Sequence, residues 1–473
     1  MHVQGEDRNE SVMFAECLED YVAAENQVRF IDCFVDRLDL TSLKFEKAVT
    51  KPTGRPPYNP ADLLKLYLYG YFNRVRSSRQ LERESYRNIE VLWLLRKLHP
   101  DFKTIADFRK VNGEAIRKVC RIFTGMCRDE GLFGGDLVAI DGSKFKACNS
   151  KKRNFTKAKL QRQIQETEKK IDEYLRQLDE EDLKEKDVAN PTAEELQKKI
   201  EWMKENLKKY LALQDQIETT GESQVSLTDS DSRAMYLGQA IQISYNVQTA
   251  VDAKNKMIVD HEVTNSVTDL GQLSPLALRV KEFLGVCGFE LLADRGYYFG
   301  EQIKICKDAG ITPYVPKPNT SANLKKKMFA KEHFTYLANE DAYSCPAGKR
   351  LTYRFSTTER GRDIRYYIAS DCKKCDLKKQ CTRNDFRRLT RLNDEAVLDE
   401  MAARIRENPQ KMSLRKTLAE HPFGTLKRAM NQGYFLLKGI QKVSTEMSLS
   451  VMAYNMKRAL NILGLTAMIA ALR

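Results

Sequence analysis

Two aspartates follow apolar runs, where a buried strand would bring each to the edge of a sheet. Asp141 follows LVAI, and Asp294 follows FELLA. If the two strands are neighbours, the carboxylates converge, and paired hard oxygen ligands suit Mg²⁺. A third acid, Glu420, begins a predicted helix, with Lys427 seven residues later on the same helical face. The pattern predicts a divalent-metal site beside a cation, although either aspartate alone would also suit a turn or a helix cap.

Four cysteines form a second candidate site. Cys345 opens a Cys-Pro-Ala-Gly sequence, and Cys372, Cys375 and Cys381 follow with the spacing C-x-x-C-x5-C. Four thiolates suit a tetrahedral structural zinc, which would hold together a segment too polar to make its own core. A reduced, metal-free cluster is the alternative. The seven other cysteines, such as Cys287, lie in apolar contexts and are predicted to be core residues.

The charge of the chain favours a polyanionic partner. Lys and Arg number 79 against 65 Asp and Glu, a formal net charge of +14, which puts nucleic acid first among the partners. Arg79, Arg83 and Arg87 recur at helical spacing and, with Arg74 and Arg76, would give one helix a stripe of guanidinium groups for DNA phosphates. A solvated helix face is the alternative interpretation.

The first part of the chain has the pattern of an all-α domain. From about Val12 to Leu132 it is predicted to be helical, with Asn59-Pro60 opening one helix and Thr104-x-x-Asp107 capping the next. We predict an all-α N-terminal DNA-binding domain over residues 1–132.

The pattern changes from residue 136. The runs LVAID, IQISYNVQTAVD and KMIVDHEVTN are β-rich, and a predicted helix at LSPLALRVKEFLG leads to FELLAD. A second helix, Gly300 to Ala309, leads to ITPYVP. Three strands followed by alternating helix and strand predict an α/β fold, a mixed sheet covered by helices, over residues 133–473.

Two segments interrupt this sheet pattern. Residues 155–219 repeat apolar residues at heptad spacing on two arms, and Asn190-Pro191 with the capping sequence Thr192-x-x-Glu195 separates the arms. This predicts an antiparallel helical hairpin, either a dimer contact or a packed insertion. Residues 320–410 are polar and basic, and they contain the cysteine cluster.

Taken together, these features resemble the bacterial insertion-sequence transposases of the Asp-Asp-Glu (DDE), ribonuclease-H-like superfamily. In that family the first Asp ends the first strand, the second follows the fourth strand, and the Glu lies on a late helix. Asp141, Asp294 and Glu420 occur in this order. The chain is most similar to the subgroup with an all-helical N-terminal domain and a Glu-x6-Lys signature. The sequences that carry this similarity are GRPPYNPADLLKLYLYGYFNRVRSSRQLERE, YNVQTAVD, VTN, CPAG with C-x-x-C, and HPFGTLKR.

The chain differs from the pattern of this family at one point. The family often places Tyr and Arg seven and four residues before the Glu, where this chain has Ser413 and Lys416. Arg415 or Lys416 is expected to supply the cation instead.

The resemblance implies a DNA transposase of a mobile element. Such an enzyme binds the terminal inverted repeats of its insertion sequence and carries out strand cleavage and strand transfer, which is DNA recombination. Two Mg²⁺ or Mn²⁺ ions held by Asp141, Asp294 and Glu420 would activate water, and later a 3′-hydroxyl, for in-line attack. Lys427 and Lys416 would neutralise phosphate charge. Because two ends are cut together, we expect a homodimer on DNA.

Other classes find little support in the sequence. The longest apolar run, Ala459 to Leu472, is interrupted by Asn461 and falls short of the roughly 20 residues that cross a bilayer. No signal peptide is apparent at the N-terminus, so we expect a cytoplasmic protein, associated with the nucleoid when bound to DNA. H-E-x-x-H, G-x-S-x-G and Walker-type motifs are missing from the sequence. Two alternatives remain: a non-catalytic, sequence-specific DNA-binding protein derived from a transposase, and a ribonuclease-H-like nuclease without strand transfer.

Overall fold

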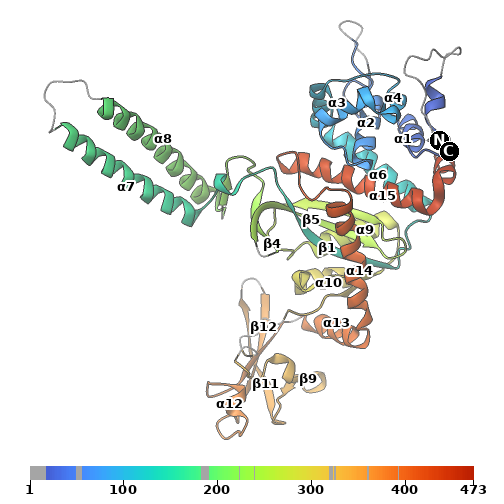
Figure 1. Cartoon of the computed structure of the whole chain (residues 1–473). Helices are drawn as coiled ribbons and strands as arrows, with labels where there is room; N and C mark the ends of the chain where they lie inside the picture. The colour runs from blue at the N-terminus through green and yellow to red at the C-terminus, as the bar shows by residue number, and fades with distance from the viewer. Residues whose placement is uncertain are drawn as a thin grey trace, which may run out of the picture.

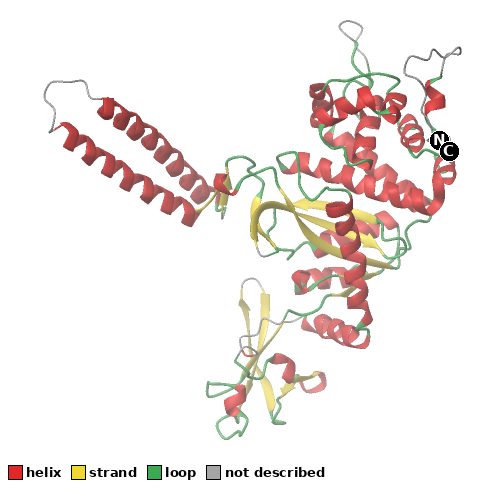
Figure 2. Cartoon of the chain, in the orientation of Figure 1, coloured by secondary structure: helices red, strands yellow, loops and turns green. Residues whose placement is uncertain are grey.

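The computed structural model describes residues 17–49, 56–182, 191–222, 224–238, 240–318, 323, 326–359, 362–392 and 394–472. Figure 1 shows a group of N-terminal helices next to a sheet that is covered by helices. A long helical hairpin projects to one side, and a second, smaller sheet lies at the end away from the N-terminal helices. Figure 2 shows that the strands gather mainly in these two separate sheets.

The described part of the N-terminal region is helical, as predicted. Its helices are α1 (Val28–Asp36), α2 (Pro60–Phe72), α3 (Ser78–Arg87), α4 (Ile89–Leu94), α5 (Phe102–Val111) and α6 (Gly113–Asp129). The Asn59 side chain accepts the N–H of Ala61 and Pro60 takes the first helical position, which confirms the predicted start of α2. The cap predicted at Thr104 is wrong, because Asp101 accepts the N–H groups of Lys103 and Thr104 and α5 therefore begins earlier. The predicted helical residues 12–16 lie outside the described residues.

The main sheet has the strand order of a ribonuclease-H-like fold. Its strands are β1 (Leu137–Lys146), β4 (Arg233–Leu237), β5 (Ala240–Asp252), β6 (Ile258–Thr264), β7 (Glu290–Leu292) and β8 (Thr312–Tyr314). The long strand β5 pairs antiparallel with β1, β4 and β6, whereas β1 pairs parallel with β7 and β7 with β8. The order β6-β5-β1-β7-β8, antiparallel on one side of β1 and parallel on the other, confirms the predicted mixed sheet.

Helices cover both the sheet and the junction with the N-terminal region. They are α9 (Leu273–Leu284), α10 (Gly300–Asp308), α13 (Glu395–Glu407), α14 (Gln410–Gly424) and α15 (Ile440–Ala470). Helix α14 packs on β1, β5 and β7, while α15 packs on β6 and on α2 and α6. In Figure 1, α15 accordingly lies between the N-terminal helices and the sheet. One continuous hydrophobic core therefore joins the two regions.

The helical hairpin is formed by α7 (Lys157–Asp182) and α8 (Pro191–Thr220), which pack along each other as predicted. A short antiparallel pair, β2 (Asn154–Thr156) and β3 (Gln224–Ser226), closes its base. The predicted break at Asn190 and the capping side chain of Thr192 lie outside the described residues. Trp202 on α8 is 63% exposed, so the apolar seam does not cover every large side chain of the arms.

The cysteine-rich segment folds into its own antiparallel sheet. Its strands are β9 (Thr335–Leu337), β10 (Ala342–Ser344), β11 (Arg350–Glu359), β12 (Arg362–Ala369) and β13 (Arg388–Leu392), in the order β13-β12-β11-β10-β9. A one-turn helix, α12 (Lys378–Cys381), lies between β12 and β13. The buried core of this sheet is small and is separate from the main core.

Two further expectations can be compared with the fold. Cys120 is buried as predicted, but Cys287 is exposed because it lies in the connection between α9 and β7 rather than within either element. Across the ranges that the structure describes, no helix is both long and apolar enough to cross a bilayer.

Candidate active site

The pairing of β1 with β7 brings the two candidate aspartates to one edge of the sheet. Ala139 on β1 lies opposite Leu292 on β7 in the parallel register, and both side chains are fully buried. Asp141 and Asp294 each follow two residues after this pair. Since the chains run in the same direction, both carboxylates emerge at the same edge.

Asp141 does not end its strand, which corrects the sequence-based expectation. Strand β1 continues to Lys146 because its second half pairs with β5, with Asp141 opposite Thr249. The parallel pairing with β7, however, stops at Ala139. Asp141 therefore lies at the end of the parallel ladder, although it is inside the strand.

The third acid is positioned by the same apolar cluster. Leu418 and Ala419 on α14 are buried against Ala139 and Leu292. Glu420 follows directly and is exposed. Each of the three acids therefore stands within two residues of one shared cluster, although the acids come from parts of the chain far apart in sequence.

The acids do not form a closed metal site in this structure. Among the described residues, no three Asp, Glu, His or Cys side chains are close enough together to hold an ion. The structure thus brings Asp141 and Asp294 into electrostatic contact, whereas Glu420 does not close a three-carboxylate set with them.

Burial and neighbouring charge both act on Asp141. Burial, with smaller contributions from the negative charges of Asp294 and Asp269, raises the pKa of Asp141 from 3.8 to about 6. The Arg415 guanidinium, 3.7 Å from the Asp141 carboxylate, and the N–H of Gly142 act in the opposite direction. Of the two cations considered from the sequence, Arg415 is therefore the one beside the first acid, and Lys416 is exposed on α14.

Asp294 is oriented by its own chain. Its carboxylate accepts the N–H of Gly296 at 2.7 Å and so caps the 3₁₀ turn Arg295–Tyr297. Tyr297 is fully buried and donates its hydroxyl to the side chain of Gln248 on β5. Burial raises the pKa of Tyr297 well above its usual value, so the phenol keeps its proton and remains a donor.

Asp269 is a site residue that the sequence analysis missed. One carboxylate oxygen accepts hydrogen bonds from Asn246 at 2.7 Å and Gln248 at 2.8 Å, and lies 3.3 Å from the ammonium of Lys144. A Cβ on Gly142 would come within 2.6 Å of the same oxygen, so a larger residue there would displace the Asp269 carboxylate from its present position. Its position in the loop after β6 gave no sequence signal beyond an ordinary polar turn.

Lys427 enters the site from the turn that follows α14. Its ammonium donates to the Ser143 hydroxyl at 2.6 Å and to the Lys144 carbonyl at 2.8 Å, and it lies 4.6 Å from the centre of the Phe145 ring. Burial lowers the pKa of Lys427 from 10.5 to about 8, while the negative charge of Asp141 opposes that change.

The helix between Glu420 and Lys427 differs from the prediction. The α-helical repeat ends at Gly424 and is followed by a π-helical turn over Thr425–Ala429. The two residues therefore do not share one regular α-helical face, because the hydrogen bonds of a π turn span five residues rather than four and change the angular spacing of the side chains. Pro422, which lacks an N–H, precedes this turn and removes one helical hydrogen bond.

The predicted DNA-contacting arginines are mostly on the surface. Arg79, Arg83 and Arg87 on α3 are exposed; Arg79 stacks over Phe102, and Arg87 pairs with a neighbouring Glu. Arg76 does not belong to this surface. It is 5% exposed and bonds the fully buried Glu446 of α15, so its function is in packing.

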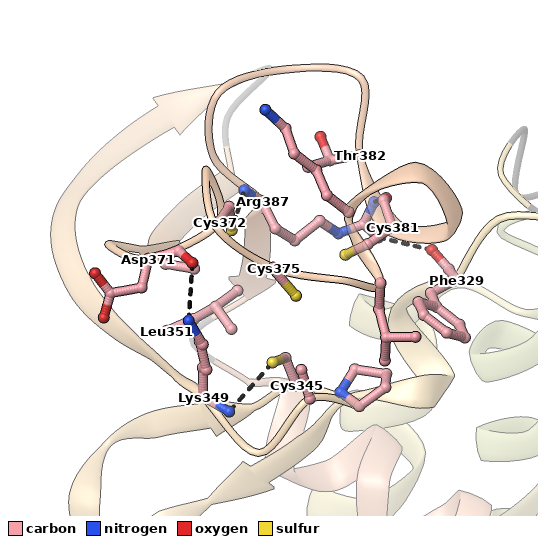
Figure 3. Close-up of a pocket in the computed structure, with 15 residues that line it drawn as sticks. Phe329, Cys345, Lys349, Leu351, Asp371, Cys372, Cys375, Cys381, Thr382 and Arg387 are labelled. Carbon is pink, nitrogen blue, oxygen red and sulfur yellow. Dashed lines mark hydrogen bonds between the residues drawn. The ribbon is translucent and has the colours of Figure 1, made fainter.

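The four cysteines of the second candidate site line one small cavity, shown in Figure 3. Each of them is a free thiol in the structure. They lie in the small β9–β13 sheet and its loops, apart from the acids of the main sheet.

Comparisons with known proteins agree with this combination of fold and acids. The strand order and the carboxylates at its edge define a ribonuclease-H-like core. Residues 16–111 match a transposase domain, DUF772, and residues 344–460 match a transposase DDE domain. The chain therefore carries two transposase domains, which confirms the resemblance to DDE transposases. The second match contains Glu420 and Lys427, whereas Asp141 and Asp294 lie outside it.

The remaining comparisons add little. A search of curated proteins finds no match. A solved structure, the synaptic complex of piggyBac transposase with hairpin DNA, is 10% identical over 94% of this chain and 84% of that chain, with a TM-score of 0.27. A likeness this weak carries no argument about either fold or function.

Proposed function

We propose that this protein is a DNA transposase that binds the terminal inverted repeats of its insertion sequence and catalyses metal-dependent strand cleavage and strand transfer. The observation that supports the proposal is the shared apolar cluster that contains Ala139, Leu292 and Ala419: Asp141 and Asp294 each follow it by two residues, and Glu420 follows Ala419 directly. The two transposase domain matches support it independently. Such an enzyme would act on DNA in the cytoplasm, at the nucleoid.

The donor set fits a divalent cation by its chemistry. Burial, with smaller contributions from the carboxylates of Asp294 and Asp269, raises the pKa of Asp141, and a bound cation would stabilise the ionised carboxylate. Asp141, Asp294 and Glu420 are the residues that would hold Mg²⁺ or Mn²⁺, with Glu420 moving inward from its exposed position. Bound there, the metal would activate the attacking oxygen and stabilise the leaving oxygen.

Lys427 and Arg415 have roles of their own in this proposal. The Lys427 ammonium is held by Ser143 and the Lys144 carbonyl on β1, two and three residues beyond Asp141. The Lys427 ammonium can therefore stabilise the negative charge that develops on a phosphate at the sheet edge. Arg415, whose guanidinium lies 3.7 Å from the Asp141 carboxylate, would turn toward a phosphate.

The DNA duplex would bind along exposed Lys and Arg side chains that lie outside the cluster of acids. Lys416 is exposed on α14, the helix of Glu420, and Arg79, Arg83 and Arg87 are exposed on α3. These side chains would contact phosphates and hold the repeat in place, without reading its sequence themselves.

The test is cleavage of a duplex carrying the inverted repeats that flank the gene. Wild type, Glu420→Gln and a matched control, Glu407→Gln, are compared with Mg²⁺; Glu407 is an exposed glutamate on α13. We expect cutting at the repeat ends by wild type and the control only, with repeat binding equal in all three. Equal cutting by Glu420→Gln would remove Glu420 from the site.

Two other outcomes would favour the competing functions. Repeat binding without cutting by wild type, in both Mg²⁺ and Mn²⁺, would indicate a non-catalytic DNA-binding protein. Cutting without joined products, when target DNA is supplied, would indicate a nuclease.

We also propose that the protein acts as a homodimer on DNA. Full-rate cleavage of a single end by a complex with the mass of one protomer would contradict this.

A further inference from the structure

The cysteine-rich sheet has little apolar material to stabilise it. Its buried core consists of Phe334, Tyr343, Leu351, Tyr367, Ala369, Cys381 and Leu389. The surrounding sequence from 345 to 391 contains fourteen Lys and Arg against five Asp and Glu, so like charges repel across it. A small core with a high net charge usually needs a crosslink or a metal ion to be stable.

The four thiols converge although they come from three separate places. Cys345 follows β10, Cys372 and Cys375 lie in the loop after β12, and Cys381 ends α12. All four line one cavity of about 20 Å³, and Figure 3 shows their sulfur atoms around it. A cavity of this volume admits one water-sized particle. The space therefore matches a single ion rather than a larger ligand.

Backbone N–H groups already point at two of the sulfur atoms. Lys349 donates to the Cys345 sulfur at 3.3 Å, and Arg387 donates to the Cys372 sulfur at 3.4 Å. Such bonds favour the thiolate form, and they are the kind of outer contact that orients metal-bound ligands. The Cys345 loop is shaped for this contact, since Gly348 has a φ of +74° and donates its N–H to the Cys345 carbonyl.

A second turn has similar geometry. The N–H of Cys375 bonds the carbonyl of Cys372 at 3.4 Å, and the N–H of Lys378 bonds that of Cys375 at 3.0 Å. The two tight turns, Cys345-Pro-Ala-Gly and Cys372-x-x-Cys375, therefore face each other across the cavity, and Cys381 lies beside them. Two turns and a further thiol supply four ligands, the number that a closed structural zinc site uses.

We propose that Cys345, Cys372, Cys375 and Cys381 bind one Zn²⁺ as a structural site that holds the β9–β13 sheet together. In the described residues the sulfur atoms do not yet lie at the spacing of a shared ion. Each cysteine side chain reorients by a single torsion, and the cavity between the thiols is the space they would turn into. The proposed zinc site takes no part in the cleavage chemistry, so a negative result for zinc binding would leave the proposed transposase function unchanged.

The first experiment measures metal in the full chain, purified under reducing conditions and supplied with Zn²⁺. Wild type, Cys375→Ser and Cys287→Ser are compared by elemental analysis; Cys287 is an exposed cysteine outside the cluster. We expect about one zinc per chain in wild type and Cys287→Ser, and its loss in Cys375→Ser. Wild type without tightly bound zinc, or a double variant of Cys375 and Cys381 that retains it, would overturn the proposal.

A second measurement does not depend on a variant that folds. Wild type is reconstituted with Co²⁺ in place of zinc, and its absorption spectrum is recorded. Four thiolate ligands in a tetrahedron give intense sulfur-to-cobalt bands and strong visible bands, both of which added Zn²⁺ should remove. Absence of these bands in the reduced, cobalt-supplied protein would overturn the proposal.

Discussion

Replacing Asp141 by Asn should stabilise the folded protein at neutral pH while it abolishes cleavage. Folding raises the pKa of Asp141 from 3.8 to about 6. A shift of about two units corresponds to a cost of about 3 kcal/mol for keeping this carboxylate ionised in the folded state. The side chain remains 19% exposed, so this value is an upper bound. Asparagine carries no charge and avoids the cost.

The sign of the pH dependence follows from the direction of the shift. Between pH 3.8 and 6 the folded state binds more protons at Asp141 than the unfolded state, so wild-type stability falls as the pH rises through this window. Above pH 6 the full cost is present. The advantage of Asp141→Asn should therefore be largest at pH 7.5, shrink to about 1 kcal/mol at pH 4.5, and vanish below 3.8.

Urea unfolding of the two proteins in EDTA, at pH 7.5 and 4.5, measures this difference. Asp172→Asn, an exposed aspartate on α7, serves as the control and should change stability little at either pH. Added Mg²⁺ should narrow the gap at pH 7.5, because an ion that binds only the wild-type site stabilises only wild type. An Asn variant no more stable than wild type at pH 7.5, or a gain that does not depend on pH, would refute the reasoning.

Four further outcomes are expected. Burial lowers the pKa of Lys427 to about 8, so wild-type cleavage should fall as the pH rises past 8, whereas Lys427→Arg should keep its rate at pH 9; parallel pH–rate profiles would contradict this. Arg76→Met leaves a carboxylate buried without its partner and should cost about 3 to 5 kcal/mol in urea unfolding. Arg83→Glu should weaken repeat binding and flatten its salt dependence in fluorescence anisotropy, and an unchanged slope would exclude α3 from the phosphate contacts. Asp269→Asn should slow cleavage at least about tenfold, because a hydrogen bond to a charged group contributes about 1.5 to 3 kcal/mol, and gel shifts should show repeat binding retained.

The main sheet could be predicted from sequence because buried strands leave a strong local signal. The runs VAI before Asp141 and LLA before Asp294 are apolar, and all six of these residues are buried in the structure. The order of strands and helices then limits the sheet to few topologies, since crossover connections follow fixed rules. The approach of the two aspartates follows from this topology alone.

The residues whose roles could not be predicted from the sequence make their contacts with residues that are far away in the chain. In the sequence Arg76 extends an arginine stripe, but its partner Glu446 is 370 residues away. Asp269 sits in a polar loop, and its partners Lys144 and Asn246 lie on two different strands. No local periodicity reports such contacts, because they exist only after the sheet and α15 have assembled.

The N-terminal helices and the first acid belong to one packed body. Arg76 donates to the backbone carbonyl of Tyr434 at 2.8 Å, and the next residue, Phe435, donates its N–H to the carbonyl of Lys146 at the end of β1. Asp141 lies on that same strand. DNA held by α3 would therefore be positioned relative to the acids by packed contacts rather than by a linker. A transposase built this way should cut at a fixed distance from the repeat it binds.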